Sequence, residues 1–390
     1  MPVIHLVVNA LAASAGGGLT YIRNVLPFLA AAPIRATVLV SPALRGEFAG
    51  ISNVDFVELQ LSPLQRFWYE QTKLPDLIRR CGANVLLSTG NFALRKSPVP
   101  QILLSRNSIY TSQDYFRDLK IRSEYRSLAN TYVRAILAKK SVLWADVTIA
   151  PSEAFANELR QWSGASVIAL HHGFDRDAFV RDTAPLADTV RAKLELVKTA
   201  FKLLFVSHYN YYRNFETLIR SLPILREKLR DRQIRLLLTC ELAAVKTPGG
   251  YRPESAAMLV KSLGVGDMIV ELGTIPYRQL HHLYSIADLY VSPAYTETFA
   301  HPLVEAMSSK LPIVVSDIPV HREICGEAAT YFSKFSESEL AESLMRAMAA
   351  PDRMKRMSMV GSQRAELFSW KTHVEQILEI CRQLVRSQKS

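Results

Sequence analysis

The sequence lacks the features that define several common classes of protein. Its 390 residues contain only four cysteines, and these are scattered singly at Cys81, Cys240, Cys325 and Cys381. Neither a disulfide framework nor a zinc site follows from single cysteines, so a reducing compartment is expected. No uninterrupted apolar run reaches the roughly 20 residues that cross a bilayer. Met1–Asn9 resembles a strand and not a signal peptide. We therefore expect a cytoplasmic protein.

Acidic residues are scarcer than basic ones, which gives a net charge of +11 and a pI near 9.5. The excess is concentrated in residues 66–140, which contain fourteen Lys and Arg against five Asp and Glu. Such a concentration favours a phosphate-rich partner: a nucleotide, a nucleic acid or an anionic membrane surface. A solvated basic face explains the same count. No aromatic-rich basic repeat or nucleic-acid reader motif is visible, so no nucleic-acid partner is expected.

Short apolar runs alternate with longer amphipathic stretches along a chain that is too long for one core. The helix-like stretches include residues 217–229, 278–286 and 336–348. The strand-like runs are residues 3–9, 36–40, 84–88, 101–105, 146–150, 166–170, 203–207, 234–239, 268–272, 287–292 and 312–316. Because these runs are apolar at consecutive positions, they suit parallel strands buried on both faces. The alternation predicts an α/β fold with doubly wound parallel sheets.

The alternation restarts after a polar, charge-mixed stretch that ends near Lys198. We expect two Rossmann-like domains, residues 1–190 and 191–369, with a final helix in residues 370–390 that packs back on the first. The domains would face each other across a cleft. Ligands of open parallel sheets bind at the carboxyl ends of the strands, so residues just after strands are the candidates for chemistry.

One segment after a strand combines several features of a ligand site. The run 287–292 leads into Glu297-Thr-Phe-Ala-His-Pro302-Leu-Val-Glu305. Pro302 suits the first position of a helix, and a helix N-terminus attracts phosphate through its amide groups and dipole. Glu297 and Glu305 would flank that phosphate and accept hydrogen bonds from sugar hydroxyls. The segment predicts a site for a nucleotide-sugar.

The sequence Glu-x-Phe-x-x-Pro-x-x-Glu-Ala-Met, followed by Leu311-Pro-Ile-Val-Val-Ser-Asp317, resembles the donor-binding signature of retaining glycosyltransferases with the GT-B fold. More narrowly it resembles glycosyltransferase family 4, which includes bacterial mannosyl- and glucosyltransferases. The resemblance implies that Glu297 contacts the donor sugar and Glu305 the ribose. It also implies that the backbone of Phe299, Ala300 and His301 contacts sugar and phosphate.

The resemblance further implies an activity. A sugar would move from a UDP- or GDP-sugar to an acceptor hydroxyl with retained anomeric configuration. No bound cofactor and no metal would be needed, and no acidic metal cluster is visible in the sequence. The adjacent His171 and His172 point in opposite directions along an extended chain, so they are not expected to share a metal.

Other positions of the second half match the family pattern in part. Ser207-His208 stands where relatives carry Gly-Arg, and Arg213-Asn214 stands at the site of a lysine. Arg213 can neutralise the donor diphosphate, because its planar fork suits phosphate oxygens. His208 would either donate a hydrogen bond to phosphate or close the loop. Thr274 and Ile275 lie where relatives receive the nucleotide base.

The first half carries two further candidates. Gly16, Gly17 and Gly18 follow the first strand, and a glycine-rich turn there lets the backbone approach a ligand closely, which would equally fit a dinucleotide fold. In relatives this loop closes over the donor phosphates and the acceptor, and we favour that role over a purely structural turn. Arg106 stands where relatives often carry a histidine close to the transferring carbon. Arg106 would contact sugar or phosphate, or would only cap the next helix.

Basic and apolar residues alternate over residues 115–140. A basic amphipathic segment binds anionic membranes, which would place the protein peripherally on the inner face of the cytoplasmic membrane. The acceptor would then be a glycan or a lipid-linked glycan of bacterial polysaccharide biosynthesis. An ordinary helix with a solvated basic side explains the same pattern. Two other functions remain open: a nucleotide-sugar epimerase of the same architecture, and a non-catalytic relative that binds glycan or nucleotide.

Overall fold

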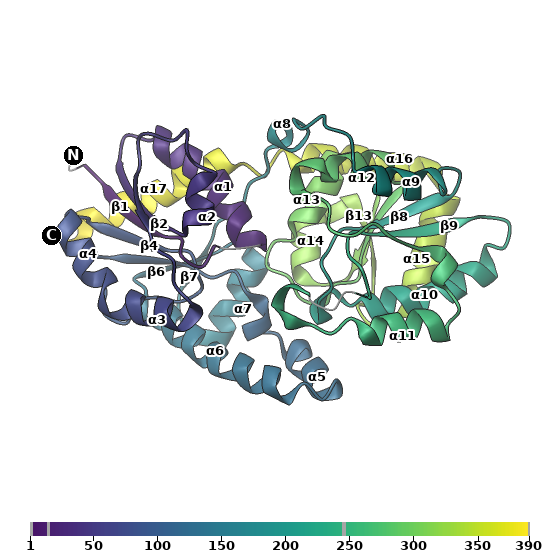
Figure 1. The fold of residues 1–390 in the computed structure, drawn as a ribbon, viewed down its shortest axis with the longest axis horizontal. Helices are drawn as coiled ribbons and strands as arrows, with labels where there is room; N and C mark the ends of the chain where they lie inside the picture. The colour runs from purple at the N-terminus through teal and green to yellow at the C-terminus, as the bar shows by residue number, and fades with distance from the viewer. Residues whose placement is uncertain (1–2, 14–15, 244–246, 389–390) are drawn as a thin grey trace. The chain divides into compact units, whose positions relative to one another are not determined.

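The computed structural model describes residues 3–13, 16–243 and 247–388. The chain divides into two compact units (Figure 1). The first unit comprises residues 1–111, 123–173 and 369–390, and the second unit comprises residues 112–122 and 174–368.

The first unit is built on a seven-stranded parallel sheet with the strand order β3-β2-β1-β4-β5-β6-β7. Its strands are β1 (His5–Asn9), β2 (Arg35–Val40), β3 (Asp55–Glu58), β4 (Val85–Ser88), β5 (Gln101–Leu104), β6 (Val147–Ala150) and β7 (Val167–Ala169). Its helices are α1 (Gly16–Ala31), α2 (Pro42–Gly46), α3 (Pro63–Thr72), α4 (Leu74–Cys81), η1 (Ser108–Tyr110), α6 (Tyr125–Trp144), α7 (Glu153–Ser163) and α17 (Trp370–Ser387).

Successive residues of β1 point to opposite faces of this sheet and enter two different cores. Leu6 and Val8 pack with apolar residues of α1 and α17. Val7 packs with Leu74 and Ile78 of α4. Because both faces are covered, the strand is buried along its whole length. This burial explains why the run is apolar at consecutive positions.

The C-terminal helix α17 packs beside α1 in the first unit (Figure 1). Its buried residues recur at helical spacing, from Trp370 and Val374 to Ile377 and Cys381. The chain comes so close at the start of α17 that a side-chain carbon on Gly173 would lie 2.0 Å from the backbone nitrogen of Trp370. Only glycine fits there.

The second unit contains a six-stranded parallel sheet with the order β10-β9-β8-β11-β12-β13. Its strands are β8 (Phe201–Phe205), β9 (Ile234–Leu238), β10 (Ile269–Glu271), β11 (Leu289–Ser292), β12 (Ile313–Ser316) and β13 (Ala329–Phe332). Its helices are α5 (Gln113–Ile121), α8 (Arg176–Phe179), α9 (Asp188–Glu195), η2 (Tyr211–Arg213), α10 (Phe215–Lys228), η3 (Pro248–Gly250), α11 (Glu254–Ser262), η4 (Gly266–Met268), η5 (Tyr277–Gln279), α12 (Leu280–Ile286), α13 (His301–Ser308), α14 (Pro319–Cys325), η6 (Gly326–Ala328), α15 (Glu337–Ala349) and α16 (Pro351–Ala365).

The units divide at Gly173 and Phe174, whereas the sequence suggested a boundary at residues 190 and 191. The backbone N–H of Phe174 donates to the carbonyl of Phe368 at 3.1 Å. Phe179 is buried against the ring of Phe174, at 5.3 Å between centroids, and against Tyr277, at 5.6 Å. These contacts place residues 174–190 in the second unit. Residues 112–122, expected in the first domain, also belong to the second unit.

The predicted α/β fold with two Rossmann-like domains is confirmed. A strand is present in each of the apolar runs named above. Two edge strands, β3 and β13, were not predicted. β3 has the sequence Asp-Phe-Val-Glu, and its exposed ends make it too short and too polar to stand out. β13 reads Ala-Thr-Tyr-Phe, and its Thr and Tyr interrupt the apolar run.

Candidate active site

The centre of the candidate site is an ion pair between Arg213 and Glu297 in the second unit. Arg213 ends η2 in the segment after β8, and Glu297 lies in the loop between β11 and α13. The Glu297 side chain is 8% exposed and that of Arg213 is 19% exposed. The structure therefore brings together the two residues that the sequence placed nearest to the transferred sugar and the diphosphate.

The loop that carries Glu297 ends in an unusual backbone conformation. Ala300 has φ 60° and ψ 62°, in the left-handed region that costs a non-glycine residue about 1–2 kcal/mol. Helix α13 then begins at His301, one residue before the expected start at Pro302, and no side chain caps it at Ala300. Strained backbone of this kind is often retained at functional sites.

Phe299 anchors this loop through its side chain. Its ring is 1% exposed and lies 5.3 Å from the ring of Phe368 and 4.9 Å from that of His301. Because the ring is buried, the predicted contact of Phe299 with a ligand would have to be made by its backbone, and that contact stays a prediction.

Glu305 lies within α13 and is more deeply buried than Glu297, at 3% exposure. The Tyr284 hydroxyl donates a hydrogen bond of 2.8 Å to one oxygen of this carboxyl group. Burial raises the pKa of Glu305 to about 7, although hydrogen bonds from Tyr284 and Tyr277 oppose the shift. Sequence reasoning missed both tyrosines that hydrogen-bond to this carboxyl group.

Backbone and amide hydrogen bonds fix the spacing of the two loops that carry the ion pair. The backbone N–H of Tyr295 donates to the carbonyl of Tyr212 at 3.0 Å. The Asn214 side chain donates to the carbonyls of Pro293, at 3.1 Å, and Lys334, at 2.7 Å. Asn214 has φ 57° and turns the chain into α10. Its side chain also joins the segment after β8 to the loop after β11. The Arg213-Asn214 motif pointed to the asparagine, but nothing in the sequence singled out Tyr295.

His208 and Ser207 follow β8 in the same segment as Arg213. The Ser207 hydroxyl donates to the carbonyl of His208 at 2.7 Å, and the Ser207 backbone N–H donates to the Thr239 hydroxyl at 3.0 Å. Burial and the nearby charge of Arg213 lower the pKa of His208 below its ordinary value. His208 is therefore neutral at pH 7 and can donate a hydrogen bond but no charge.

Thr274 and Ile275 lie in the segment after β10, at the same carboxyl edge of the sheet as Glu297 and Arg213. Thr274 is exposed, whereas Ile275 is 8% exposed. Gly273 turns the chain there with φ 76°. The sequence predicted this segment as the place of the nucleotide base, and that assignment stays a prediction.

In the first unit, Arg106 and the glycine-rich turn lie together. A side-chain carbon on Gly18 would lie 2.5 Å from Nη2 of Arg106, so the glycine leaves the space that the guanidinium fills. Arg106 Nε donates to the carbonyl of Thr89 at 3.0 Å, and its backbone N–H donates to Asn91 at 2.7 Å. Gly16 opens α1 and Gly17 is exposed. Asn107, and not Arg106, caps the following helix η1.

Arg106 differs from Arg213 in its electrostatic surroundings. Among residues 3–13, 16–243 and 247–388, no carboxylate forms an ion pair with it. Burial lowers the pKa of its guanidinium to about 10. A desolvated cation without a counter-ion is suited to an anionic ligand. In the same described ranges, no three His, Cys, Asp or Glu side chains are grouped as metal ligands would be.

The fold is that of GT-B glycosyltransferases. Sucrose-phosphate synthase from Thermosynechococcus elongatus superposes with a TM-score of 0.76 at 19% identity, covering 98% of this chain and 100% of that chain. Anabaena HepE, solved in complex with UDP-glucose, superposes with a TM-score of 0.71 at 16% identity, covering 97% of this chain and 100% of that chain.

The similarity to a known family lies in the second unit. Residues 187–364 match the model of the family described as Glycosyl transferases group 1. D-inositol 3-phosphate glycosyltransferase from Corynebacterium aurimucosum is 23% identical over 269 residues, covering 67% of this chain. The chain spans 63% of the length of that relative and 45% of the equivalent enzyme from Thermomonospora curvata.

Proposed function

We propose that the protein transfers a sugar from a UDP- or GDP-sugar to an acceptor hydroxyl with retained anomeric configuration, as in glycosyltransferase family 4. The observation that carries this proposal is the Arg213–Glu297 ion pair beside the N-terminus of α13. This pair lies within residues 187–364, the range that matches the glycosyltransferase family. The second unit is thus the nucleotide-sugar-binding half in this proposal.

The donor diphosphate would bind between α13 and the segment after β8. The first turn of a helix directs amide groups and a positive dipole outward, which favours phosphate. Arg213 can still donate a hydrogen bond, because its buried Nε has no hydrogen-bond partner among the described residues. His208 would add one neutral hydrogen bond. Glu297 would accept hydroxyl groups of the sugar, Glu305 those of the ribose, and the segment at Thr274 and Ile275 the base.

In the transfer step, the bond between the anomeric carbon and the diphosphate oxygen breaks while a bond to the acceptor oxygen forms. The acceptor proton passes to an oxygen of the departing diphosphate, so no separate protein base is needed. Positive charge from Arg213 and the amides of α13 stabilises the leaving group. These groups supply the charge that a metal ion would otherwise provide, and we propose a metal-independent reaction without a bound cofactor.

The first unit would bind the acceptor. Arg106 supports this role because it is a desolvated cation without a carboxylate partner in the described ranges. Its guanidinium is held against Gly18 by the hydrogen bond to Thr89. An anionic group of the donor or the acceptor would complete its coordination.

Helix α6 supports the proposed contact with an anionic membrane. Its buried residues are small or medium-sized: Thr131, Ala135, Ala138, Ser141 and Val142. Its exposed residues include large apolar ones, Tyr125, Tyr132, Val133, Ile136 and Leu143, together with the cations Arg126, Arg134, Lys139 and Lys140. Large apolar side chains beside cations suit the interface of an anionic bilayer. Residues 112–122 belong to the second unit, so of the basic segment 115–140 the proposed surface uses α6.

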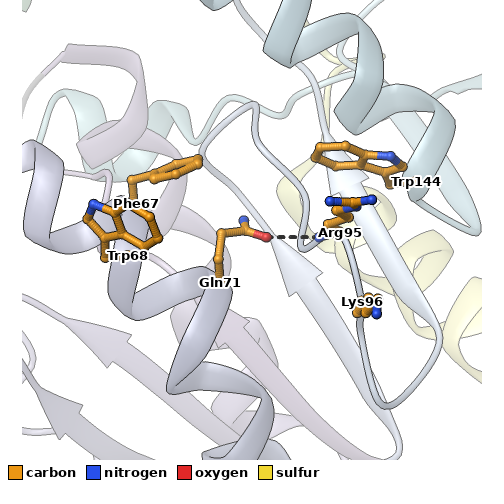
Figure 2. A pocket seen from close by; sticks show the side chains of 6 residues that line it. All are labelled: Phe67, Trp68, Gln71, Arg95, Lys96 and Trp144. Atoms are coloured by element: carbon orange, nitrogen blue, oxygen red, sulfur yellow. Dashed lines mark hydrogen bonds between the residues drawn. The ribbon is translucent and has the colours of Figure 1, made fainter.

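A pocket of about 370 Å³ adjoins the C-terminal end of α6 (Figure 2). Trp144 closes one side and Phe67 and Trp68 of α3 the other. Arg95 and Lys96 are exposed beside these rings. Figure 2 shows the Arg95 guanidinium beside the Trp144 ring. Tryptophan next to Arg and Lys is typical of a headgroup layer, so this pocket would extend the membrane surface of α6.

The acceptor would accordingly be a glycan or a lipid-linked glycan of the cell surface, and the protein would work at the inner face of the cytoplasmic membrane. None of the described helices has the length and apolarity to span a bilayer. Sedimentation with vesicles tests the membrane contact. Binding to anionic vesicles at low salt that is lost with Ile136→Glu supports it, and equal behaviour with neutral vesicles contradicts it.

Product analysis tests the activity itself. The protein is incubated with UDP- and GDP-sugars and a panel of glycan acceptors, and the products are analysed by mass spectrometry and NMR. Release of nucleoside diphosphate with a new α- or β-linkage that matches the donor anomer supports the proposal. An altered sugar on intact nucleotide would indicate an epimerase. Tight donor binding without turnover would indicate a non-catalytic relative.

A further inference from the structure

Helix α5 (Gln113–Ile121) belongs to the second unit, although the chain on both sides of it belongs to the first. The chain enters the second unit at Ser112 and leaves it after Arg122. Ser123 turns the chain there with φ 56°. Only two residues of α5, Tyr115 and Leu119, are buried. A helix of nine residues is marginal in isolation, so specific contacts with the second unit must hold it in place.

The first group of contacts joins α5 to both loops of the candidate donor site. The Tyr295 hydroxyl donates to the Asp118 carboxylate at 2.9 Å. Tyr295 lies in the loop that carries Glu297, and its backbone N–H is bonded to Tyr212, the neighbour of Arg213. The ring of Tyr115 packs edge-on against Tyr212 at 6.2 Å. Asp118 and Tyr115 therefore contact the two segments that hold the ion pair.

The second group of contacts centres on Arg122. Its guanidinium donates to Asp118 at 2.8 Å and to Glu216 at 2.9 Å, and it lies 4.3 Å from the centre of the Tyr211 ring. The Tyr209 hydroxyl also donates to Glu216, at 2.8 Å. Arg122 and Glu216 are 19% and 16% exposed. Partly buried networks of this kind hold their members in one arrangement.

Charge gives Arg122 a second role. Glu216 opens α10 directly after the segment of Arg213, where a diphosphate is proposed to bind. A carboxylate there would repel phosphate unless a cation neutralised it. Arg122 supplies that cation, and Asp118 holds the guanidinium from the other side.

From these contacts we infer that Asp118 and Arg122 are positioning residues of the donor site. This inference rests on the proposed function. Asp118 holds the side chain of Tyr295 in place. Because the backbone N–H of Tyr295 is bonded to Tyr212, Asp118 also sets the spacing between the loops of Glu297 and Arg213. Arg122 neutralises Glu216 and holds the segment from Tyr209 to Arg213. Neither residue needs to touch the substrate. A stretch of the acceptor-half sequence thus contributes to donor binding.

Variants on α5 test the inference directly. Asp118→Asn and Tyr295→Phe each weaken or remove the same hydrogen bond, and Arg122→Met removes the cation. The matched control is Asp352→Asn, because Asp352 is an exposed aspartate of the same unit, in the first turn of α16. Two quantities are measured on the full chain: amide hydrogen exchange of residues 209–214 and 293–299, and the Kd for UDP and GDP by calorimetry.

We expect faster exchange in both loops and a roughly tenfold weaker Kd in Asp118→Asn, Tyr295→Phe and Arg122→Met. The double variant of Asp118 and Tyr295 should be no worse than the more affected single one, because both changes remove one bond. Unchanged exchange in Asp118→Asn, an unchanged Kd, or an equal response in Asp352→Asn would overturn the inference. A wild-type protein that binds no nucleoside diphosphate would instead refute the proposed function, while the exchange data would still decide the role of α5.

Discussion

Arg213 and Arg106 are both partly buried, but within the part of the chain that the structure describes only Arg213 has a carboxylate partner. Arg213 of the second unit is paired with Glu297. Arg106 of the first unit has hydrogen bonds to Thr89 and Asn91, and burial lowers its pKa to about 10. The loops around Arg213 are also cross-bonded by Asn214.

This difference indicates two ways of preparing a cation for an anionic ligand. A paired arginine is held in place before the ligand arrives. It also neutralises the charge of its buried partner carboxylate. An arginine without a partner carries an electrostatic cost in the free protein, which an incoming anion removes. Substitution should therefore destabilise the fold at Arg213 but not at Arg106, while both substitutions should impair binding.

The largest effect is expected for Glu297→Ala. The side chain would lose its contact with the donor sugar, and transfer should fall on the order of 10³-fold or be abolished. Circular dichroism should show an intact fold. Glu327→Ala, an exposed glutamate of the same unit, serves as the control. Turnover of Glu297→Ala near the wild-type rate would refute the assignment.

Arg213→Ala should weaken the binding of nucleoside diphosphate by about 10- to 100-fold, because charge-assisted hydrogen bonds to phosphate are lost. The same change leaves Glu297 buried without its cation, so the melting temperature should also fall. Calorimetry and thermal unfolding measure the two effects. Unaltered affinity would show that Arg213 does not contact the diphosphate.

Arg106→Met tests the other side of the comparison. Turnover should fall about tenfold, because a cation near the ligand is lost. The melting temperature should stay the same or rise, because a desolvated charge is removed and no carboxylate loses its partner. A melting temperature as low as that of Arg213→Ala would show that the two cations do not differ as described.

Gly18→Ala and Gly17→Ala form a matched pair for the glycine-rich turn. A methyl group on Gly18 would lie 2.5 Å from Arg106 Nη2, whereas one on Gly17 would lie 3.9 Å from its nearest neighbour, Nη1 of Arg106. Gly18→Ala should displace the guanidinium and lower turnover severalfold, and Gly17→Ala should be close to wild type. Equal turnover in the two variants would argue that the position of Arg106 is unimportant.

The smallest effect concerns stability and pH. The pKa of Glu305 is raised to about 7 in the folded chain, so the folded state binds this proton more tightly than the unfolded chain does. The stability from this group is complete below its unfolded value of about 4.5 and is lost as pH rises through 7. The melting temperature of wild type should fall by about 2–4 °C more than that of Glu305→Gln between pH 5.5 and 8. An equal fall in the melting temperatures of wild type and Glu305→Gln would refute the raised pKa of Glu305.

Much of the fold could be predicted from the sequence, because strands covered on both faces carry apolar residues at consecutive positions, as in Leu6–Val8 of β1 and Leu203–Phe205 of β8. Glu297 and Arg213 could be proposed because a motif of nearby residues carries them. Tyr284, Tyr295 and Asp118 could not, since their roles depend on contacts between residues far apart in the chain. The place of α5 was missed for the same reason. The sequence of a short helix with few apolar residues does not indicate which unit the helix packs against.

The binding of nucleoside diphosphates to the purified full chain tests the central claim most directly. Calorimetry with UDP and GDP, on wild type and on Arg213→Ala, compares the two proteins under identical conditions. We expect wild type to bind at least one of the two nucleotides and Arg213→Ala to bind it at least tenfold more weakly. Absence of binding by wild type, or equal affinity in the two proteins, would contradict this expectation.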